Sequence, residues 1–357
     1  MISYIAAAFV GLVLAFIISV GIIPYIIRIS HKKGWFDPKD SRKLHSGDIS
    51  RLGGIGIFLG FFIAFIVVYI AFGFNGSEKF SYDKILLISG VIIMFITGVL
   101  DDFFFLKARI KLAGQIIAAI IIVFLAGYYI KSFIVPILNV EISLGLAGQF
   151  ITVFWILAVV NAVNLIDGMD GLASSIVITA IFFLNIISFL QSNYVAMLIG
   201  LTYLGSMLGF LRYNFPPAKI FMGDGGSHFI GTMLAIMPFI IYGREVSSFA
   251  LIPVLLLLSI PVFDTFFAIL RRVRKNVSIG IADKEHIHHK LIALGLTDKK
   301  ILFWMSFYTA VMGVISVYWV LTQSTAGMLI ALLGGAAGGV FFIIISSAYH
   351  KMQDKTR

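Results

Sequence analysis

Two adjacent carboxylates, Asp101 and Asp102, stand at the end of an apolar run, and Lys111 follows nine residues after Asp102. The C-terminus of a helix disfavours negative charge, so two acids there need a cation or a proton to offset them. An acidic pair followed by a base is the pattern expected of a site that binds both a divalent metal and phosphate groups. We therefore predict such a site around Asp101, Asp102 and Lys111. A solvated helix end is the structural alternative.

A second polar group lies in the segment 161–171, directly after another apolar run. Its polar residues are Asn161, Asn164, Asp167 and Asp170. The first three recur every third residue, so on a helix they share one face. The glycines that follow let the chain break and let a ligand approach the backbone closely. Packing alone does not explain this many polar groups beside an apolar span, so the segment is predicted to belong to a functional site.

Two further carboxylates stand in contexts that favour function. Asp224 lies among glycines in the sequence FMGDGG, which begins at Phe221, and an acid that opens a helix there suits a metal or phosphate site. A simple turn would look similar. Asp264 lies inside a later apolar run, three residues after Pro261, which is expected to kink that helix. Asp264 is a candidate substrate-binding residue, with pairing to an arginine as the structural alternative.

The longest basic loop contains His286, His288 and His289, which invites a zinc interpretation. On one helix, however, His288 would point about 160° away from His286, so three ring nitrogens could not converge on one ion. With lysines and arginines nearby, diphosphate binding is the favoured interpretation, and a basic helix at the lipid surface is the alternative. An earlier basic loop holds Lys43 and His45, for which membrane anchoring by positive charge is the competing explanation.

The elements that must position these residues are transmembrane helices. Hydrophobic residues make up 60% of the 357 positions and charged residues only 12%, so the chain cannot be a soluble globular enzyme. We predict an all-α, polytopic membrane protein that forms a single domain over residues 1–357, with about eleven transmembrane helices. The apolar runs are Tyr4–Ile27, Gly53–Phe74, Ile85–Leu100, Ala113–Ile130, Phe150–Val163, Leu172–Leu190, Val195–Leu211, Phe229–Tyr242, Phe249–Leu270, Ile301–Leu321 and Met328–Ala348. The absence of cysteine excludes disulfides, thiolate zinc sites and a cysteine nucleophile.

The distribution of charge predicts the orientation of the chain. With eleven spans and the N-terminus outside, 23 of the 27 lysines and arginines and all seven histidines fall on the inner side. This asymmetry follows the positive-inside rule and places the C-terminus and the candidate site on the cytoplasmic side. The net charge of +10 is therefore interpreted as a topology signal, and no nucleic-acid partner is expected.

Four motifs in this order resemble a known family. They are Asp101–Asp102 with Lys111, NLIDGMDG from Asn164, FMGDGG from Phe221 and HIHH from His286. Together they resemble the polyprenyl-phosphate N-acetylhexosamine-1-phosphate transferases, the membrane glycosyltransferase-4 family. HIHH and the stretch around Lys43 and His45 are similar to the bacterial undecaprenyl-phosphate N-acetylglucosamine-1-phosphate transferases. The phospho-MurNAc-pentapeptide transferases usually carry HHHFE in this loop, where this chain has HIHH. That branch is therefore the alternative to the favoured one.

This resemblance implies a reaction in which GlcNAc-1-phosphate passes from UDP-GlcNAc to undecaprenyl phosphate, with release of UMP. The reaction would begin the synthesis of teichoic acid, O-antigen or a related surface polysaccharide in a bacterial plasma membrane. The implied cofactor is Mg²⁺, with Mn²⁺ as the alternative ion. The resemblance leaves a homodimer, the downstream polymer and GalNAc in place of GlcNAc open.

The resemblance also implies roles for individual residues. Asn164 and Asp224 would ligate the metal, and Asp101, Asp102 and Asp167 would be catalytic, as base, metal contact or covalent nucleophile. Orientation and electrostatics are favoured over proton abstraction, because a phosphate monoester is already mostly dianionic at neutral pH. The implied substrate-binding residues are Lys111, Asp170, Phe221, His286, His288, His289, Lys43, His45 and Asp264. A proton- or ion-coupled carrier is the rival class, because polar groups within spans also mark ion pathways.

Overall fold

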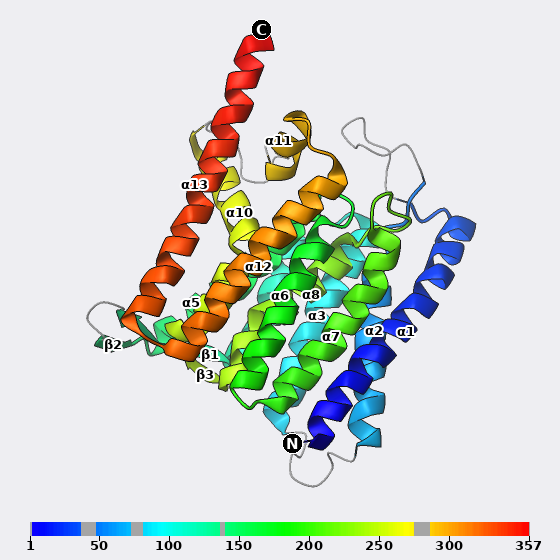
Figure 1. Cartoon of the computed structure of the whole chain (residues 1–357). Helices are drawn as coiled ribbons and strands as arrows, with labels where there is room; N and C mark the ends of the chain where they lie inside the picture. The colour runs from blue at the N-terminus through cyan, green and yellow to red at the C-terminus, as the bar shows by residue number, and fades with distance from the viewer. Residues whose placement is uncertain (1, 37–47, 73–80, 136–139, 275–285, 357) are drawn as a thin grey trace.

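The computed structural model describes residues 2–36, 48–72, 81–135, 140–274 and 286–356. Within these ranges, ten helices are long and apolar enough to cross a membrane, and one bent helix pair brings the number to eleven. The ten are α1 (Ile2–Lys33), α2 (Gly53–Ala71), α3 (Tyr82–Phe104), α4 (Ala108–Ile120) continued by the π-helical turn η1 (Ile121–Leu125), α5 (Leu146–Ile166), α6 (Leu172–Leu190), α7 (Tyr194–Asn214), α8 (Gly223–Tyr242), α12 (Asp298–Thr322) and α13 (Thr325–Thr356). The predicted multi-pass helical membrane protein is confirmed (Figure 1).

The bent pair consists of α9 (Ile252–Leu257), preceded by the 3₁₀ turn η2 (Ser248–Leu251), and α10 (Ser259–Arg274). The two helices meet at an angle of 87°, where the sequence predicted one span with a kink at Pro261. The break lies at Leu258 instead. Pro261 is the third residue of α10, where a backbone N–H has no intrahelical partner and its loss disrupts no helical hydrogen bond.

A small sheet corrects the prediction that the protein is entirely α-helical. In the described part of the chain, β1 (Tyr129–Val135) pairs antiparallel with β2 (Val140–Ser143) and parallel with β3 (Glu245–Ser247). The sequence of β1, YIKSFIV, is rich in β-branched and aromatic residues, and the buried Ile130 and Ser132 alternate with the exposed Lys131 and Phe133. The fourth apolar run, which was expected to extend to Ile130, therefore ends in this strand.

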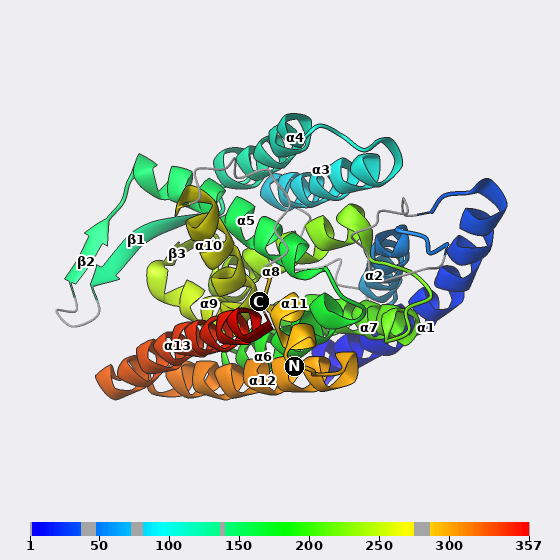
Figure 2. The same cartoon turned by 90° about the horizontal axis from the view of Figure 1, so that it is seen from above.

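Helix α8 lies near the centre of the bundle, as Figure 2 shows, and nearly all of its residues are buried. It packs against α3, α5 and α2. Two glycines allow the backbones to approach closely near its first turn. A Cβ at Gly54 of α2 would lie 2.1 Å from the Gly226 nitrogen, and a Cβ at Gly98 of α3 would lie 2.3 Å from the Asp224 carbonyl oxygen. Small residues at such crossings are typical of helix packing in membranes.

The two chain termini lie at opposite ends of the bundle (Figure 1). The sheet lies at the end that carries the N-terminus. Helices α1, α5 and α7 end at the other end, where α2, α6 and α8 begin and the short helix α11 (Ile287–Ala293) lies. The end of α3 and the start of α4 lie there too, because Asp102 and Lys111 form hydrogen bonds with the first turn of α8. The motifs found in the sequence therefore gather at the end that carries the C-terminus.

Candidate active site

Asp224, the second residue of α8, is the centre of a polar cluster that draws on five separate parts of the chain. Its Oδ2 accepts a hydrogen bond from the Lys111 Nζ of α4, and its Oδ1 accepts one from the Asn164 Nδ2 of α5 at 3.1 Å. Lys111 Nζ also lies 3.6 Å from the Asp101 Oδ2 at the end of α3. The structure thus brings together Asp101, Lys111, Asn164 and Asp224, which the sequence singled out separately.

Asp102 binds the N-terminus of α8. Its Oδ1 and Oδ2 accept hydrogen bonds from the backbone nitrogens of Asp224 and Gly225, each at 2.8 Å. The first N–H groups of a helix lack intrahelical partners and carry a partial positive charge, so a carboxylate there is stabilised. The acid pair at the end of α3 is therefore offset by the start of another helix as well as by Lys111. In this arrangement Asp102 positions Asp224, while its predicted catalytic role stays a prediction.

Arg51 is a member of the cluster to which the sequence analysis gave no role. Its Nη2 lies 3.7 Å from the Asp102 Oδ1 and 3.6 Å from the Asp224 Oδ1. It is held there because Phe221 N donates to the Ser50 carbonyl oxygen at 2.8 Å and Gly53 N donates to the Phe221 carbonyl oxygen at 3.0 Å. A basic residue just before the glycine pair that begins α2 was the available signal. These contacts also fix the backbone of Phe221.

The segment after α5 is braced against the connection from α7 to α8. Asp170 is 4% exposed, and its Oδ2 accepts a hydrogen bond from the Ala218 backbone nitrogen at 2.8 Å. Asp167, directly after the last residue of α5, is partly buried. Burial, followed by the neighbouring Asp224 carboxylate, raises the pKa of Asp167 well above its ordinary value. The catalytic role of Asp167 stays a prediction.

Asp264 anchors the histidine loop. Its Oδ2 lies 2.8 Å from the His286 Nδ1, and its Oδ1 accepts a hydrogen bond from the Ile287 nitrogen at 2.9 Å. Asp264 is 2% exposed, so its contacts in the structure are with the loop. A direct contact with substrate, which the sequence predicted, stays untested.

The histidines are arranged differently from the single helix assumed above. Helix α11 begins at Ile287, and His286 before it has an extended backbone. The rings of His286 and His288 therefore lie parallel with centroids 6.1 Å apart, whereas a helix would turn them away from each other. The ring centroids of His288 and His289 are 4.2 Å apart.

His288 is the most enclosed of the three. It is 2% exposed, and neither ring nitrogen has a hydrogen-bond partner among the described residues. Burial, followed by the neighbouring His289, lowers the pKa of His288 to about 3, so the ring is neutral near pH 7. Buried polar atoms are normally paired, so the two unpaired nitrogens make His288 a candidate to bind a ligand group.

Gly168 lies against the His288 ring, and a Cβ added to Gly168 would be 2.7 Å from His288 Cε1. We expect Gly168→Ala to displace the histidine loop and to lower the turnover of the enzyme reaction proposed below by about 10- to 100-fold, as outer-shell changes do. Gly21→Ala in α1 is the matched control, because a Cβ there meets nothing within 4 Å. Equal turnover of the two variants in a UMP-release assay would contradict the assigned contact.

The cluster around Asp224 fits a magnesium ion shared with phosphate groups. Among the described residues, no three His, Cys, Asp or Glu side chains are placed to hold a metal by themselves. Mg²⁺ does not need this, since it is usually held by one or two carboxylates together with water and substrate phosphates. Asp101, Asp102 and Asp224 exceed by one formal charge the two cations that pair with them, Lys111 and Arg51. Asp224 and the Asn164 amide oxygen are the groups that would hold the ion.

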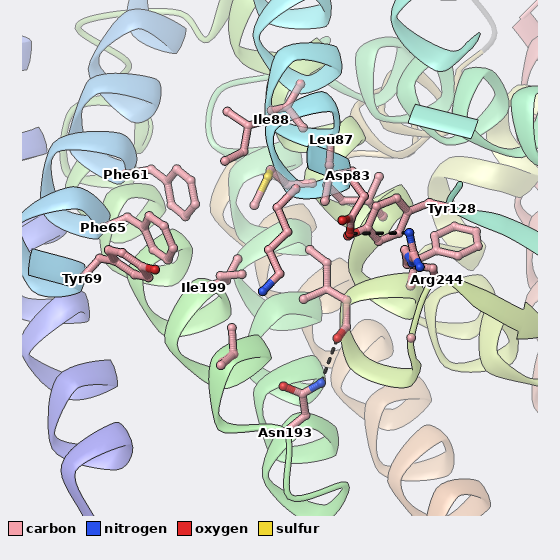
Figure 3. Close-up of a pocket in the computed structure, with 18 of the residues that line it drawn as sticks. Phe61, Phe65, Tyr69, Asp83, Leu87, Ile88, Tyr128, Asn193, Ile199 and Arg244 are labelled. Carbon is pink, nitrogen blue, oxygen red and sulfur yellow. Dashed lines mark hydrogen bonds and ion pairs between the residues drawn. The ribbon is translucent and has the colours of Figure 1, made fainter. Parts of the chain in front are cut away.

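Lys43 and His45 lie outside the described residues, so their predicted contacts stay predictions. A separate cavity of about 360 Å³ is drawn in Figure 3. Its lining includes Tyr69 near the end of α2 and Asp83 at the start of α3, so it lies at the end of the bundle that carries the N-terminus. Apolar side chains such as Phe61 and Phe65 line much of it, and its polar residues include Arg244, which lies 3.7 Å from Asp83. None of the predicted site residues lines this cavity.

Residues 84–242 match the family model described as glycosyl transferase family 4. The chain is 36% identical over 295 residues to a probable undecaprenyl-phosphate N-acetylglucosaminyl 1-phosphate transferase of Bacillus subtilis. The aligned region covers 81% of this chain and 80% of that protein. The chain is 27% identical over 317 residues to the undecaprenyl-phosphate alpha-N-acetylglucosaminyl 1-phosphate transferase of Yersinia pestis, covering 86% and 82%. It is also 30% identical over 330 residues to a phospho-N-acetylmuramoyl-pentapeptide-transferase of Lactococcus lactis, covering 86% and 96%.

Proposed function

Because the chain belongs to glycosyl transferase family 4, we propose that it transfers GlcNAc-1-phosphate from UDP-GlcNAc to undecaprenyl phosphate, giving undecaprenyl-diphospho-GlcNAc and UMP. The structural observation that carries this proposal is the convergence of Asp101, Lys111, Asn164 and Asp224 from four helices at one end of the bundle. Carboxylate and amide oxygens beside an ammonium group are what a magnesium–diphosphate complex requires. A carrier has no support in these comparisons.

In the proposed reaction, an oxygen of the lipid phosphate attacks the β-phosphorus of UDP-GlcNAc. The bond from that phosphorus to the bridging oxygen breaks, and UMP leaves with the bridging oxygen. Lys111 and Arg51 are placed to neutralise phosphate oxygens as charge develops. A bound Mg²⁺ would polarise the phosphoryl group and clamp the diphosphate. Asp102 holds the start of α8 in register, and the dianionic lipid phosphate needs no strong base.

The preference for GlcNAc rests on the histidine loop and on the relatives. The loop sequence HIHH departs from the HHHFE usual in the pentapeptide branch. The neutral His288 ring has one donor and one acceptor nitrogen, both unpaired among the described residues, and this suits a sugar hydroxyl group. We propose that this end of the bundle faces the cytoplasm of a bacterial cell, because its loops and the C-terminal tail hold most of the lysines and arginines.

The test is UMP release by the purified full-length protein in detergent with undecaprenyl phosphate. We expect release with UDP-GlcNAc only when the lipid phosphate is present. UDP-MurNAc-pentapeptide and UDP-GalNAc are tested as alternative donors in the same assay. Preferential use of UDP-MurNAc-pentapeptide would overturn the substrate assignment. Release of UMP without the lipid, together with a trapped phospho-aspartyl enzyme, would overturn the single displacement.

Removal of metal gives a second expected outcome. Treatment with EDTA should abolish UMP release, and Mg²⁺ should restore it, because the acidic cluster and the diphosphate would otherwise repel each other. Ca²⁺, which prefers more ligands and longer distances, is the matched control ion and should restore less activity. Full activity in EDTA would refute the metal assignment of Asn164 and Asp224.

A further inference from the structure

A second polar layer lies directly beneath the Asp224 cluster, deeper in the bundle. The Asn161 Nδ2 of α5 donates to the Gln115 Oε1 of α4 at 3.0 Å, and the Gln115 Nε2 lies 2.9 Å from the His228 Nε2 of α8. Gln115 is 1% exposed and His228 is fully buried. These hydrogen bonds join three helices in the interior of the protein.

Each member of this layer lies one helical turn from a residue of the cluster on the same helix. Gln115 follows Lys111 by four residues, His228 follows Asp224 by four, and Asn161 precedes Asn164 by three. The pairs are Lys111 and Gln115 in α4, Asn164 and Asn161 in α5, and Asp224 and His228 in α8. At these spacings the members of each pair share one helix face, so the rotation of each helix sets both layers together.

The direction of the hydrogen bonds between the three side chains follows from the amide orientations. Asn161 donates to the amide oxygen of Gln115, so the Gln115 amide nitrogen faces His228. That nitrogen can only donate, so His228 Nε2 accepts and the proton of the neutral ring lies on Nδ1, which has no hydrogen-bond partner among the described residues. The Asn161 amide nitrogen also donates to the Leu157 carbonyl oxygen of its own helix at 2.8 Å. The two hydrogen bonds to Gln115 favour one arrangement, because a slip of one helix would leave its buried amide unpaired.

Helix α4 has particular need of such a link. It packs against α3 and α5, and its connection to α8 runs through the long side chains of Lys111 and Gln115. Lysine side chains are flexible, so an ion pair alone does not fix the depth of α4 relative to α8. The glutamine–histidine hydrogen bond lies one turn below and supplies that constraint.

We infer that Gln115, Asn161 and His228 are positioning residues that set the register of α4, α5 and α8, and thereby bring Lys111, Asn164 and Asp224 together to receive the metal–diphosphate group. The inference rests on the proposed function and adds residues that do not touch the substrate. It assigns a role to His228, which the sequence analysis did not single out.

The test measures Mn²⁺ binding to the purified protein by electron paramagnetic resonance, alongside kcat and KM for UDP-GlcNAc. We expect Gln115→Leu and His228→Leu to weaken Mn²⁺ binding and to lower kcat by about 10- to 100-fold, as loss of outer-shell partners does. His228→Gln keeps an acceptor oxygen within reach of Gln115. It should therefore retain much of the Mn²⁺ binding and of the kcat that His228→Leu loses. Thr232→Val is the matched control, because its buried hydroxyl in α8 donates only to the His228 carbonyl oxygen of its own helix among the described contacts.

The outcomes separate the two proposals. If wild-type protein binds Mn²⁺ no better than Asp224→Asn, the metal site of the proposed function fails, and the positioning role falls with it. If wild-type protein binds Mn²⁺ and Gln115→Leu binds it equally well with unchanged kcat, only the positioning role is overturned. A purely structural role would lower Tm in Gln115→Leu, His228→Leu and His228→Gln alike, with no change in the Mn²⁺ affinity of the folded protein.

Discussion

Asp224→Asn is expected to lower UMP release by about 100- to 1,000-fold, the scale seen when a charge-stabilising group is removed from an active site. Asp224 pairs with Lys111 and lies 3.6 Å from Arg51 Nη2, and it accepts a hydrogen bond from Asn164. The change is nearly isosteric, so the helix should remain in place. What is lost is the charge that would hold the metal and that orients both cations. The measurement is kcat for UMP release with UDP-GlcNAc and undecaprenyl phosphate.

Asp298→Asn is the matched control for this change. Asp298 also lies in the first turn of a membrane-length helix, α12, but it is exposed and is no part of the cluster. Its loss should leave kcat unchanged, because the effect of an exposed charge on a helix end is small. Wild-type turnover in Asp224→Asn, with Asp298→Asn also at wild-type turnover, would show that the cluster is not the reaction centre.

Most of the helices were predictable from sequence because lipid imposes one simple requirement. A span needs a run of apolar residues of sufficient length, and that property is local. The strand β1 escaped the prediction because its first two residues, Tyr129 and Ile130, continue the apolar run of the preceding helix, so hydropathy alone does not separate them from that helix. The 87° break at Leu258 escaped it too, since the proline three residues later was the more obvious signal.

The site was predictable in part, for a related reason. Charged and amide side chains stand out against an apolar chain, which is why Asp101, Lys111, Asn164 and Asp224 were found. Their mutual contacts depend on how distant helices pack, and no local pattern encodes that. Asp102 illustrates the difference, because its partners are two backbone nitrogens more than 100 residues away.

The second large effect is expected at Gly223, the first residue of α8. Its φ is +72°, and a Cβ there would lie 1.9 Å from the Arg51 carbonyl oxygen and 2.7 Å from the Asp102 Oδ2. Left-handed backbone at a residue other than glycine costs about 1–3 kcal/mol, and the clash adds to this. We expect Gly223→Ala to pull the start of α8 away from Asp102, so that UMP release falls by about 100-fold or more.

Gly243→Ala at the other end of the same helix separates strain from displacement of the site. Gly243 also has a positive φ, +107°, but a Cβ there meets nothing within 4 Å. Both variants should therefore lower Tm through backbone strain, while only Gly223→Ala should lose UMP release and Mn²⁺ binding. The Gly223 backbone lies between Arg51 and Asp102, so an added methyl group separates the two residues that hold Asp224 in place. Equal activity of the two variants would mean that the contact between Asp102 and the start of α8 does not position Asp224 for the reaction.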